Sequence, residues 1–497
     1  MKYIVNFLII ICALDTSAQT NFNKTMFFGP FGYSIKYISP NNYIHDTMPN
    51  KMLTLFQSGS ASICDSNGNL LIISNGMNLY NGTGTAYIEN GDTMAEPDYF
   101  ADRAGHDAYS QTCLILPFAQ KKYYYVQVST SDTQLYKALN INNDLRMDRL
   151  YYSVIDMNMN GGQGNVVQRM KTLIDNKYLL RTAMQACKHA NGKDWWVLKI
   201  GADSVLGYMV YKYLFTKDSV YDVGIQLLNS SYKGDWGGGQ MQFNQDGNKW
   251  ACSLSNSFDG EVFLADFDRC TGMLTNIDTV LVKIEMGIPP SYQGLDSMNT
   301  GICFSPNGNL LYVSRALHIV QYNLQNHTQY KVYGPDTMTQ FALYVKLNLG
   351  PDDKIYIGHY HGVSQQMSII DNPDAVGVGC NFCRKCVRAE GVYNYLHSMA
   401  DMPDYDLGAE LPCWPLTNEE LSAAADENRE LIVYPNPVSD KLKIENGPPG
   451  RMKMKELYNA VGQLLHTTKE NEIDVRNYMK GMYYLKCGSM VKKIIIE

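Results

Sequence analysis

An all-β fold is predicted by the composition of the chain and by a hairpin pattern that recurs along it. The 497 residues include 36 Tyr, 40 Gly and only 18 Pro, and 45% of them are hydrophobic. Aromatic side chains fit pleated surfaces, and glycine supplies the positive φ angles of tight turns. We therefore expect many short strands joined by tight turns, in a chain long enough for two or three folded domains.

The recurring hairpin is clearest at residues 301–314, where apolar strands flank Asn307-Gly308. Asn-Gly between two such segments is a strong signal of a two-residue hairpin turn. Related hairpins are predicted at residues 62–74, 113–128, 187–200, 241–252 and 347–357. Their turns are roughly 45 to 70 residues apart, as expected for four-stranded propeller blades with variable loops. The sequence thus predicts a six- or seven-bladed β-propeller over residues 19–410, closed by pairing of residues 27–38 with residues 399–407.

The N-terminus has the pattern of a signal peptide. Lys2 precedes an apolar run over residues 4–14, and the small residues 16–18 offer a cleavage site before Gln19. The run is too short for a retained membrane helix, and no later stretch reaches the roughly 18 apolar residues of one. We assign residues 1–18 to a signal peptide and expect no transmembrane helix in the mature chain.

The C-terminal part of the chain forms a separate unit. The propeller pattern stops before residues 411–430, an acidic, Ala-rich segment that we interpret as a linker. About seven short strands are predicted over residues 431–497, which indicates a small β-sandwich.

Several motifs of this C-terminal unit occur in the order and spacing of the C-terminal sorting domain of type IX (Por) secretion. The residues that carry the likeness are Tyr434, Pro435, Asn436, Pro437, Gly462, Asp474, Gly481, Tyr483, Lys492 and Lys493. The unit resembles that family. The resemblance implies that the type IX translocon and its sorting machinery recognise the domain, and that the chain is secreted or displayed on the cell surface. The alternative is an ordinary accessory sandwich, because a fold alone does not define a function.

The repeated phrases also resemble a family of Bacteroidota surface proteins whose propeller precedes a sorting domain. The likeness covers residues 26–408 and is carried by residues 65–71, 156–165, 188–196, 304–308 and 370–375. It implies an exported propeller with no assigned reaction.

Charge and cysteine content restrict the possible partners. The net charge of −7 disfavours nucleic acid as a partner, because phosphate binding needs a positive surface. Cys12 leaves with the signal peptide, so an odd number of the twelve cysteines enters an oxidising compartment. The bridge candidates are Cys380, Cys383, Cys386 and Cys413. Their spacing also suits zinc or an iron–sulfur cluster, but export favours disulfides.

Catalytic motifs of the common hydrolase, metalloprotease and nucleotide-binding types are missing from the sequence. The best binding candidates are His106, Asp107 and Gln111, which precede a predicted inner strand, and His359 with His361, whose side chains share one face of a strand. The histidine pair suits a metal, but with no third ligand in view we predict a polar face, and we expect no metal and no cofactor.

The functional prediction is a non-enzymatic surface or secreted binding protein whose ligand is a glycan or another protein. Loops on a rigid propeller commonly form binding sites. The alternative is an extracellular propeller hydrolase or lyase that uses carboxylates or histidines gathered at the mouth of the channel.

Overall fold

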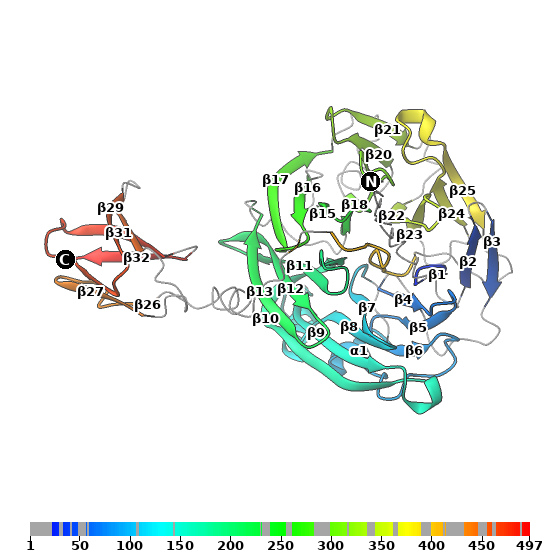
Figure 1. The fold of residues 1–497 in the computed structure, drawn as a ribbon, viewed down its shortest axis with the longest axis horizontal. Coiled ribbons are helices and arrows are strands. Elements are labelled where there is room, and N and C mark those ends of the chain that lie inside the picture. Colours follow the sequence, from blue (N-terminus) through cyan, green and yellow to red (C-terminus); the bar gives the residue numbers. More distant parts are fainter. Residues whose placement is uncertain are drawn as a thin grey trace, which may run out of the picture.

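The computed structural model contains a ring of antiparallel sheets, followed by a group of C-terminal sheets (Figure 1). It describes residues 22–28, 33–39, 42–47, 56, 59–105, 109–142, 145–228, 230, 239–254, 261–282, 299–315, 318–334, 343–360, 366–388, 399–410, 413, 432–445, 455–459, 464–487 and 490–497. The predicted signal peptide and most of the predicted linker lie outside these ranges. So do four of the predicted site residues, His106, Asp107, His361 and Gly462.

Two three-stranded antiparallel sheets come first in the chain. They consist of β1 (Thr25–Phe28), β2 (Tyr33–Ser39) and β3 (Asn42–Thr47), and of β4 (Ala61–Cys64), β5 (Leu70–Ser74) and β6 (Leu79–Asn81). The turn from β4 to β5 is held by Asp65, whose Oδ1 accepts the N–H groups of Asn67 and Asn69 at 2.9 Å each. Local hydrogen bonds of this kind hold the predicted hairpin turn.

A seven-stranded sheet follows. Its strands are β7 (Cys113–Ala119), β8 (Lys122–Ser129), β9 (Met147–Asp156), β10 (Asn165–Lys188), β11 (Trp195–Asp203), β12 (Gly207–Phe215) and β13 (Val220–Leu227), in spatial order of sequence. The central strand β10 is 24 residues long. It pairs with β9 up to Leu179 and with β11 at Leu179 and over residues 184–188, with a register shift between Leu179 and Met184. One long strand therefore serves two four-stranded halves of the sheet.

Three regular four-stranded meanders complete the ring. They are β14 (Gly239–Phe243), β15 (Lys249–Leu254), β16 (Glu261–Asp268) and β17 (Met273–Leu281); β18 (Asn299–Phe304), β19 (Leu310–Arg315), β20 (His318–Asn323) and β21 (Gln329–Tyr333); and β22 (Leu343–Leu349), β23 (Ile355–Tyr360), β24 (Gln366–Ile370) and β25 (Phe382–Arg388). The predicted hairpins over residues 241–252, 301–314 and 347–357 are confirmed by the pairing of the first two strands in each meander.

The helical segments are short and lie in connections between strands. They are α1 (Pro97–Asp102), α2 (Asp132–Lys137), the π-helix η1 (Ala138–Asn142) and the 3₁₀ helices η2 (Asn160–Gly162) and η5 (Gly377–Cys380). Ser131 begins α2 as its N-cap, because its Oγ accepts the N–H of Gln134 at 3.3 Å.

The first and last sheets of the ring meet through apolar side chains. Met26 and Ile35 share one buried cluster with Tyr356 and Met367, and Met399 joins it. The predicted backbone pairing of residues 27–38 with residues 399–407 was wrong. Strand β1 pairs with β2, and Asp401 forms a parallel bridge with Ala61 of β4. The N-terminal strands satisfy their hydrogen bonds within their own sheet, so side-chain packing closes the ring.

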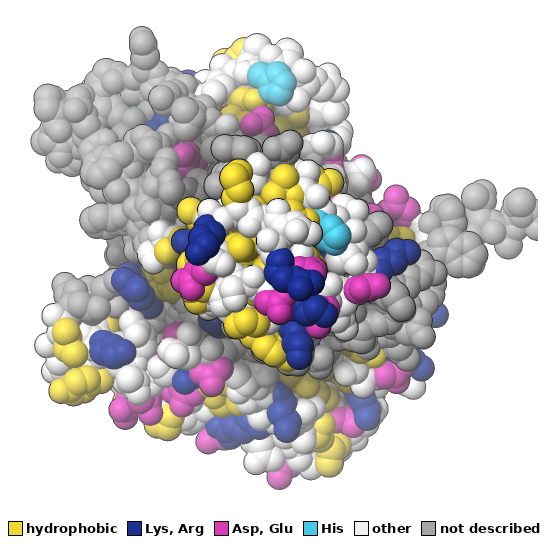
Figure 2. Space-filling model, turned by 90° about the vertical axis from the view of Figure 1, so that its left-hand side faces the viewer, with side chains coloured by type: hydrophobic (Ala, Val, Ile, Leu, Met, Phe, Trp, Pro, Cys, Tyr) yellow, Lys and Arg dark blue, Asp and Glu magenta, His cyan; other side chains and the backbone are white. Residues whose placement is uncertain are grey.

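The C-terminal part contains two sheets around one apolar cluster. Their strands are β26 (Ile432–Tyr434), β27 (Lys441–Glu445) and β30 (Glu472–Asp474), and β28 (Lys455–Asn459), β29 (Leu464–Thr468), β31 (Gly481–Cys487) and β32 (Met490–Ile496). Leu442, Leu457, Leu485 and Ile494 are fully buried in the cluster. Figure 2 faces this side of Figure 1 and shows Lys and Arg side chains intermixed with Asp and Glu. The unit thus has its own core and a charged, mixed surface.

Candidate functional site

An open cavity of about 350 Å³ lies where the inner strands of several sheets end. Strands β10, β14, β18 and β22 contribute their last residues, and the extended segment 402–407 forms another side. The lining includes Gln185, Gln242, Phe243, Gln245, Asn348, Asp353, Met402, Asp404, Asp406 and Leu407. Because the strands converge from separate sheets, residues far apart in the sequence face one space.

Side-chain amides dominate the polar part of the lining. Asn348, near the end of β22, is 8% exposed, and its amide has no hydrogen-bond partner among the residues that the structure describes. Gln185 of β10 is 3% exposed; its Oε1 accepts the N–H of Ala186 at 3.0 Å. Each amide carries both donors and an acceptor, so the cavity presents hydrogen-bonding groups that the fold itself leaves largely unused.

Carboxylates add negative charge to the lining. They belong to Asp353, Asp404 and Asp406. Burial raises the pKa of the Asp404 carboxyl above its usual value. The N–H of Asp406 donates to Asp404 Oδ1 at 2.9 Å, whereas Gln245 Nε2 donates to Asp353 Oδ1 at 3.2 Å. No Lys, Arg or His is among the described residues that line the cavity. In the part of the chain with described coordinates, no three His, Cys, Asp or Glu side chains gather closely enough to hold a metal ion.

The segment that borders the cavity, residues 399–410, is here called the strap. It begins at the Asp401–Ala61 bridge beside β4 and continues to Tyr405, whose buried hydroxyl donates to the carbonyl of Ile115 in β7 at 2.9 Å. The carbonyl of the same residue, Tyr405, accepts a hydrogen bond from Lys188 Nζ of β10. The strap therefore crosses several sheets in succession and is bound to each by hydrogen bonds.

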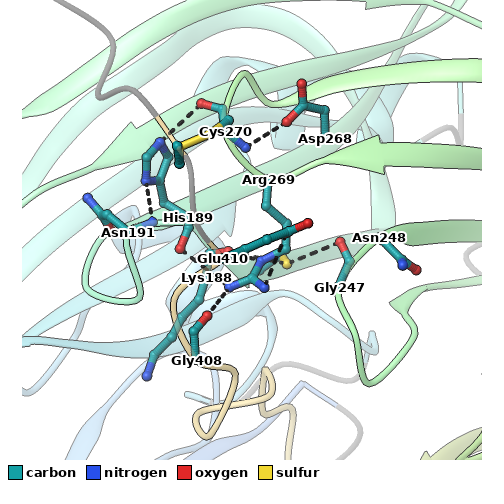
Figure 3. Close-up of polar contacts among 12 residues, drawn as sticks. Lys188, His189, Asn191, Gly247, Asn248, Asp268, Arg269, Cys270, Gly408 and Glu410 are labelled. Carbon is teal, nitrogen blue, oxygen red and sulfur yellow. Dashed lines mark hydrogen bonds and ion pairs between the residues drawn. A yellow bond between two sulfur atoms is a disulfide. The ribbon is translucent and has the colours of Figure 1, made fainter. Parts of the chain in front are cut away.

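The end of the strap is fixed to the turn between β16 and β17 (Figure 3). Arg269 in that turn is buried, and its guanidinium donates to the carbonyls of Lys188 and Gly408 and faces Glu410 at 3.7 Å. The adjacent Cys270 forms a disulfide with Cys413, with Cα atoms 5.7 Å apart. One turn thus holds the strap by a cation and holds Cys413, just after the strap in sequence, by a covalent bond.

The two predicted binding residues that the structure describes, Gln111 and His359, do not line the cavity. Gln111 is fully buried; its N–H donates to Asp401 at 2.8 Å, and its amide exchanges two hydrogen bonds with the backbone of Met241. His359 is 3% exposed and bonds Ser368 Oγ at 3.0 Å. Both side chains hold strands together. His106, Asp107 and His361 lie outside the described residues.

The predicted cysteine cluster divides into three environments. Cys383 and Cys386 form a disulfide with Cα atoms 5.9 Å apart, and Cys413 pairs with Cys270, which the sequence did not single out. Cys380 does not take part in a bridge: it is a buried free thiol in the same apolar cluster as Tyr312. Burial raises the pKa of this thiol, as expected of an inert cysteine.

The predicted sorting residues cluster around the last strand. Asn436 Nδ2 donates to the carbonyl of Lys493 at 2.9 Å, and Asn436 Oδ1 accepts the N–H of Ile495 at 2.8 Å. Tyr483 is nearly buried and its hydroxyl donates to the carbonyl of Met479. Asp474 accepts from Arg476, which lowers the pKa of Asp474 to about 2. The Tyr434–Pro437 segment is thereby tied to β32.

Residues 432–497 match the family of secretion system C-terminal sorting domains. This match marks the chain as cargo of type IX secretion, destined for the cell surface or the medium, and implies contact with the type IX machinery. No curated protein sequence matches the chain. In the described residues, no helix has both the length and the apolar character needed to span a membrane.

Solved structures that are similar to the chain include the following three. Hydrazine synthase from Kuenenia stuttgartiensis has 12% identity and a TM-score of 0.37, covering 69% of this chain and 83% of its own. Sqt1 from Saccharomyces cerevisiae has 10% identity and a TM-score of 0.38, with 76% and 90% covered. A putative 6-phosphogluconolactonase from Bacteroides uniformis has 10% identity and a TM-score of 0.36, with 95% and 99% covered.

Proposed function

We propose that the ring is a seven-bladed β-propeller that binds a ligand in the cavity, and that type IX secretion places this binding site outside the cell. Two three-stranded sheets, the two halves of the seven-stranded sheet and three four-stranded meanders supply the blades. The sorting match supports the destination, and the cavity supports binding as the task.

The observation that carries this proposal is the amide of Asn348. It is 8% exposed, lines the cavity and has no partner among the described residues. Its amide atoms are not among the described side-chain atoms that are wholly shielded without a hydrogen bond, so they face the open cavity and can bond a ligand there. A ligand that bonds this amide gives it a function.

A second candidate, an extracellular hydrolase or lyase, is favoured by one observation. Asp404 borders the cavity, and burial raises the pKa of its carboxyl. The general acid of glycoside cleavage is usually a carboxyl group whose pKa is shifted in this direction. A hydrolase or lyase also needs a second catalytic group placed opposite this carboxyl, and Asp404 is the only described carboxyl of the lining with a raised pKa.

The test compares the full chain with Asn348→Leu, using retention on cell-surface polysaccharides and product analysis of the same material. We expect the variant to lose roughly tenfold in affinity, since a good hydrogen bond is worth about 1 kcal/mol or more. Its thermal stability should be unchanged or higher, because an unpaired polar group has been removed. Asn140→Leu, at an exposed position away from the cavity, is the matched control.

Two results would contradict the binding proposal. Release of products without stable retention would favour the hydrolase or lyase. Equal retention of the wild type, Asn348→Leu and Asn140→Leu would show that the ligand binds elsewhere.

A further inference from the structure

We infer that the ligand of the cavity is an uncharged sugar, a neutral mono- or short oligosaccharide. This inference rests on the proposed binding function and specifies its ligand. Three properties of the lining carry it: its charge, its balance of donors and acceptors, and its size.

The charge of the lining excludes anionic ligands. Asp353, Asp404 and Asp406 border the cavity, and no cationic side chain is among the described residues of the lining. Lys188 and Arg269 act electrostatically on Asp404 but are not part of the lining: Lys188 donates to the carbonyl of Tyr405, and Arg269 donates to the carbonyls of Lys188 and Gly408. A phosphate, sulfate or uronate in the cavity would therefore contact carboxylates and no cationic side chain of the lining, and like charges at close range repel by about 1–4 kcal/mol.

The donors and acceptors of the lining match hydroxyl groups. Gln185, Gln242 and Asn348 offer amides that donate and accept, and the carboxylates accept only. A sugar hydroxyl does both, so it satisfies an amide and a carboxylate at once. Phe243, Met402 and Leu407 supply apolar surface in the same cavity, which suits the C–H faces of a sugar ring.

The size of the cavity favours a small ligand over a protein surface. Its volume of about 350 Å³ is at the lower end of the range of pockets for small molecules. A protein partner needs a broad interface of about 800 Å² on each side. The amides that need partners lie inside the cavity, where one or two sugar rings reach them and a flat surface does not.

The experiment measures binding of the full chain to a panel of defined oligosaccharides by calorimetry. The neutral probes are cello-, malto- and chito-oligosaccharides, and the anionic probe is oligogalacturonate of matched length. We expect binding of at least one neutral probe and at least tenfold weaker binding of the uronate. Asp404→Asn should reduce the difference in affinity between the neutral probe and the uronate about tenfold. Asp218→Asn, at an exposed bend outside the lining, should leave this difference unchanged.

The outcomes separate this inference from the function on which it rests. Uronate binding as tight as that of the neutral probes overturns the inference and leaves the binding function intact. If none of the sugars binds, the inference fails. The binding function then survives only if retention on surface material remains sensitive to Asn348→Leu, and falls with the inference if it does not.

Discussion

Single buried polar side chains join the inner strands of the ring. Lys346 of β22 and Asp401 of the strap form an ion pair with side chains 2% and 1% exposed. Lys346 Nζ also donates to the carbonyl of Met399 at 2.8 Å, and Asp401 accepts the N–H of Gln111. Gln240 of β14 has a similar role, because its amide bonds the backbones of Ile302 and Leu347 in the next two meanders.

We predict that Lys346→Met lowers the free energy of unfolding by about 3–5 kcal/mol, because it leaves the Asp401 charge buried without a partner. Urea denaturation followed by tryptophan fluorescence measures this loss. Lys249→Met, which breaks the half-exposed pair with Asp266, is the control and should cost less than about 1 kcal/mol. A similar small loss in both variants would show that the buried pair does not stabilise the ring.

At the scale of elements, the strap is the segment on which the fold and the cavity both depend. It runs from the bridge with β4 to the Arg269 turn, and its residues 402–404, 406 and 407 line the cavity. Its only regular pairing among the described residues is an isolated bridge. Side chains, together with a disulfide at Cys413 just after it in sequence, therefore hold the strap, rather than a sheet.

We predict that Cys270→Ser with Cys413→Ser destabilises the chain and weakens ligand retention. The bridge closes a loop with a sequence separation of 143, which in the chain-entropy model corresponds to about 5 kcal/mol. The matched control is Cys383→Ser with Cys386→Ser, whose separation of 3 corresponds to about 2 kcal/mol and whose residues do not line the cavity. Thermal unfolding and retention are measured on both. Unchanged retention in the first variant would mean that non-covalent contacts alone hold the strap.

At the scale of the whole molecule, export and binding are assigned to parts with separate cores. The C-terminal cluster draws its buried residues only from residues 433–496. The clusters of the ring draw theirs from residues 26–405. Separate cores are expected of domains that fold independently.

We predict that removing residues 432–497 abolishes export across the outer membrane in a host with type IX secretion and leaves the ring folded. Fractionation of cells and medium measures the location, and circular dichroism of the retained protein measures its fold. Lys441→Ala, at an exposed ion pair of the C-terminal unit, should be exported normally. Loss of the ring's fold on truncation would contradict the independence of the two parts.

The sequence by itself determined the local structure and the destination. Hairpins such as residues 301–314 follow from apolar strands around an Asn-Gly turn, and the sorting motifs are contiguous or closely spaced. These signals are local, because each turn satisfies its own hydrogen bonds.

The tertiary structure decided the rest. Gln185, Asn348 and Asp404 face one cavity only because strands from different sheets converge there, and no spacing in the sequence records that convergence. Cys413 and Cys270 meet because the strap crosses the ring. Gln111 holds strands together instead of binding a ligand, because its backbone N–H bonds Asp401 and its amide bonds the backbone of Met241.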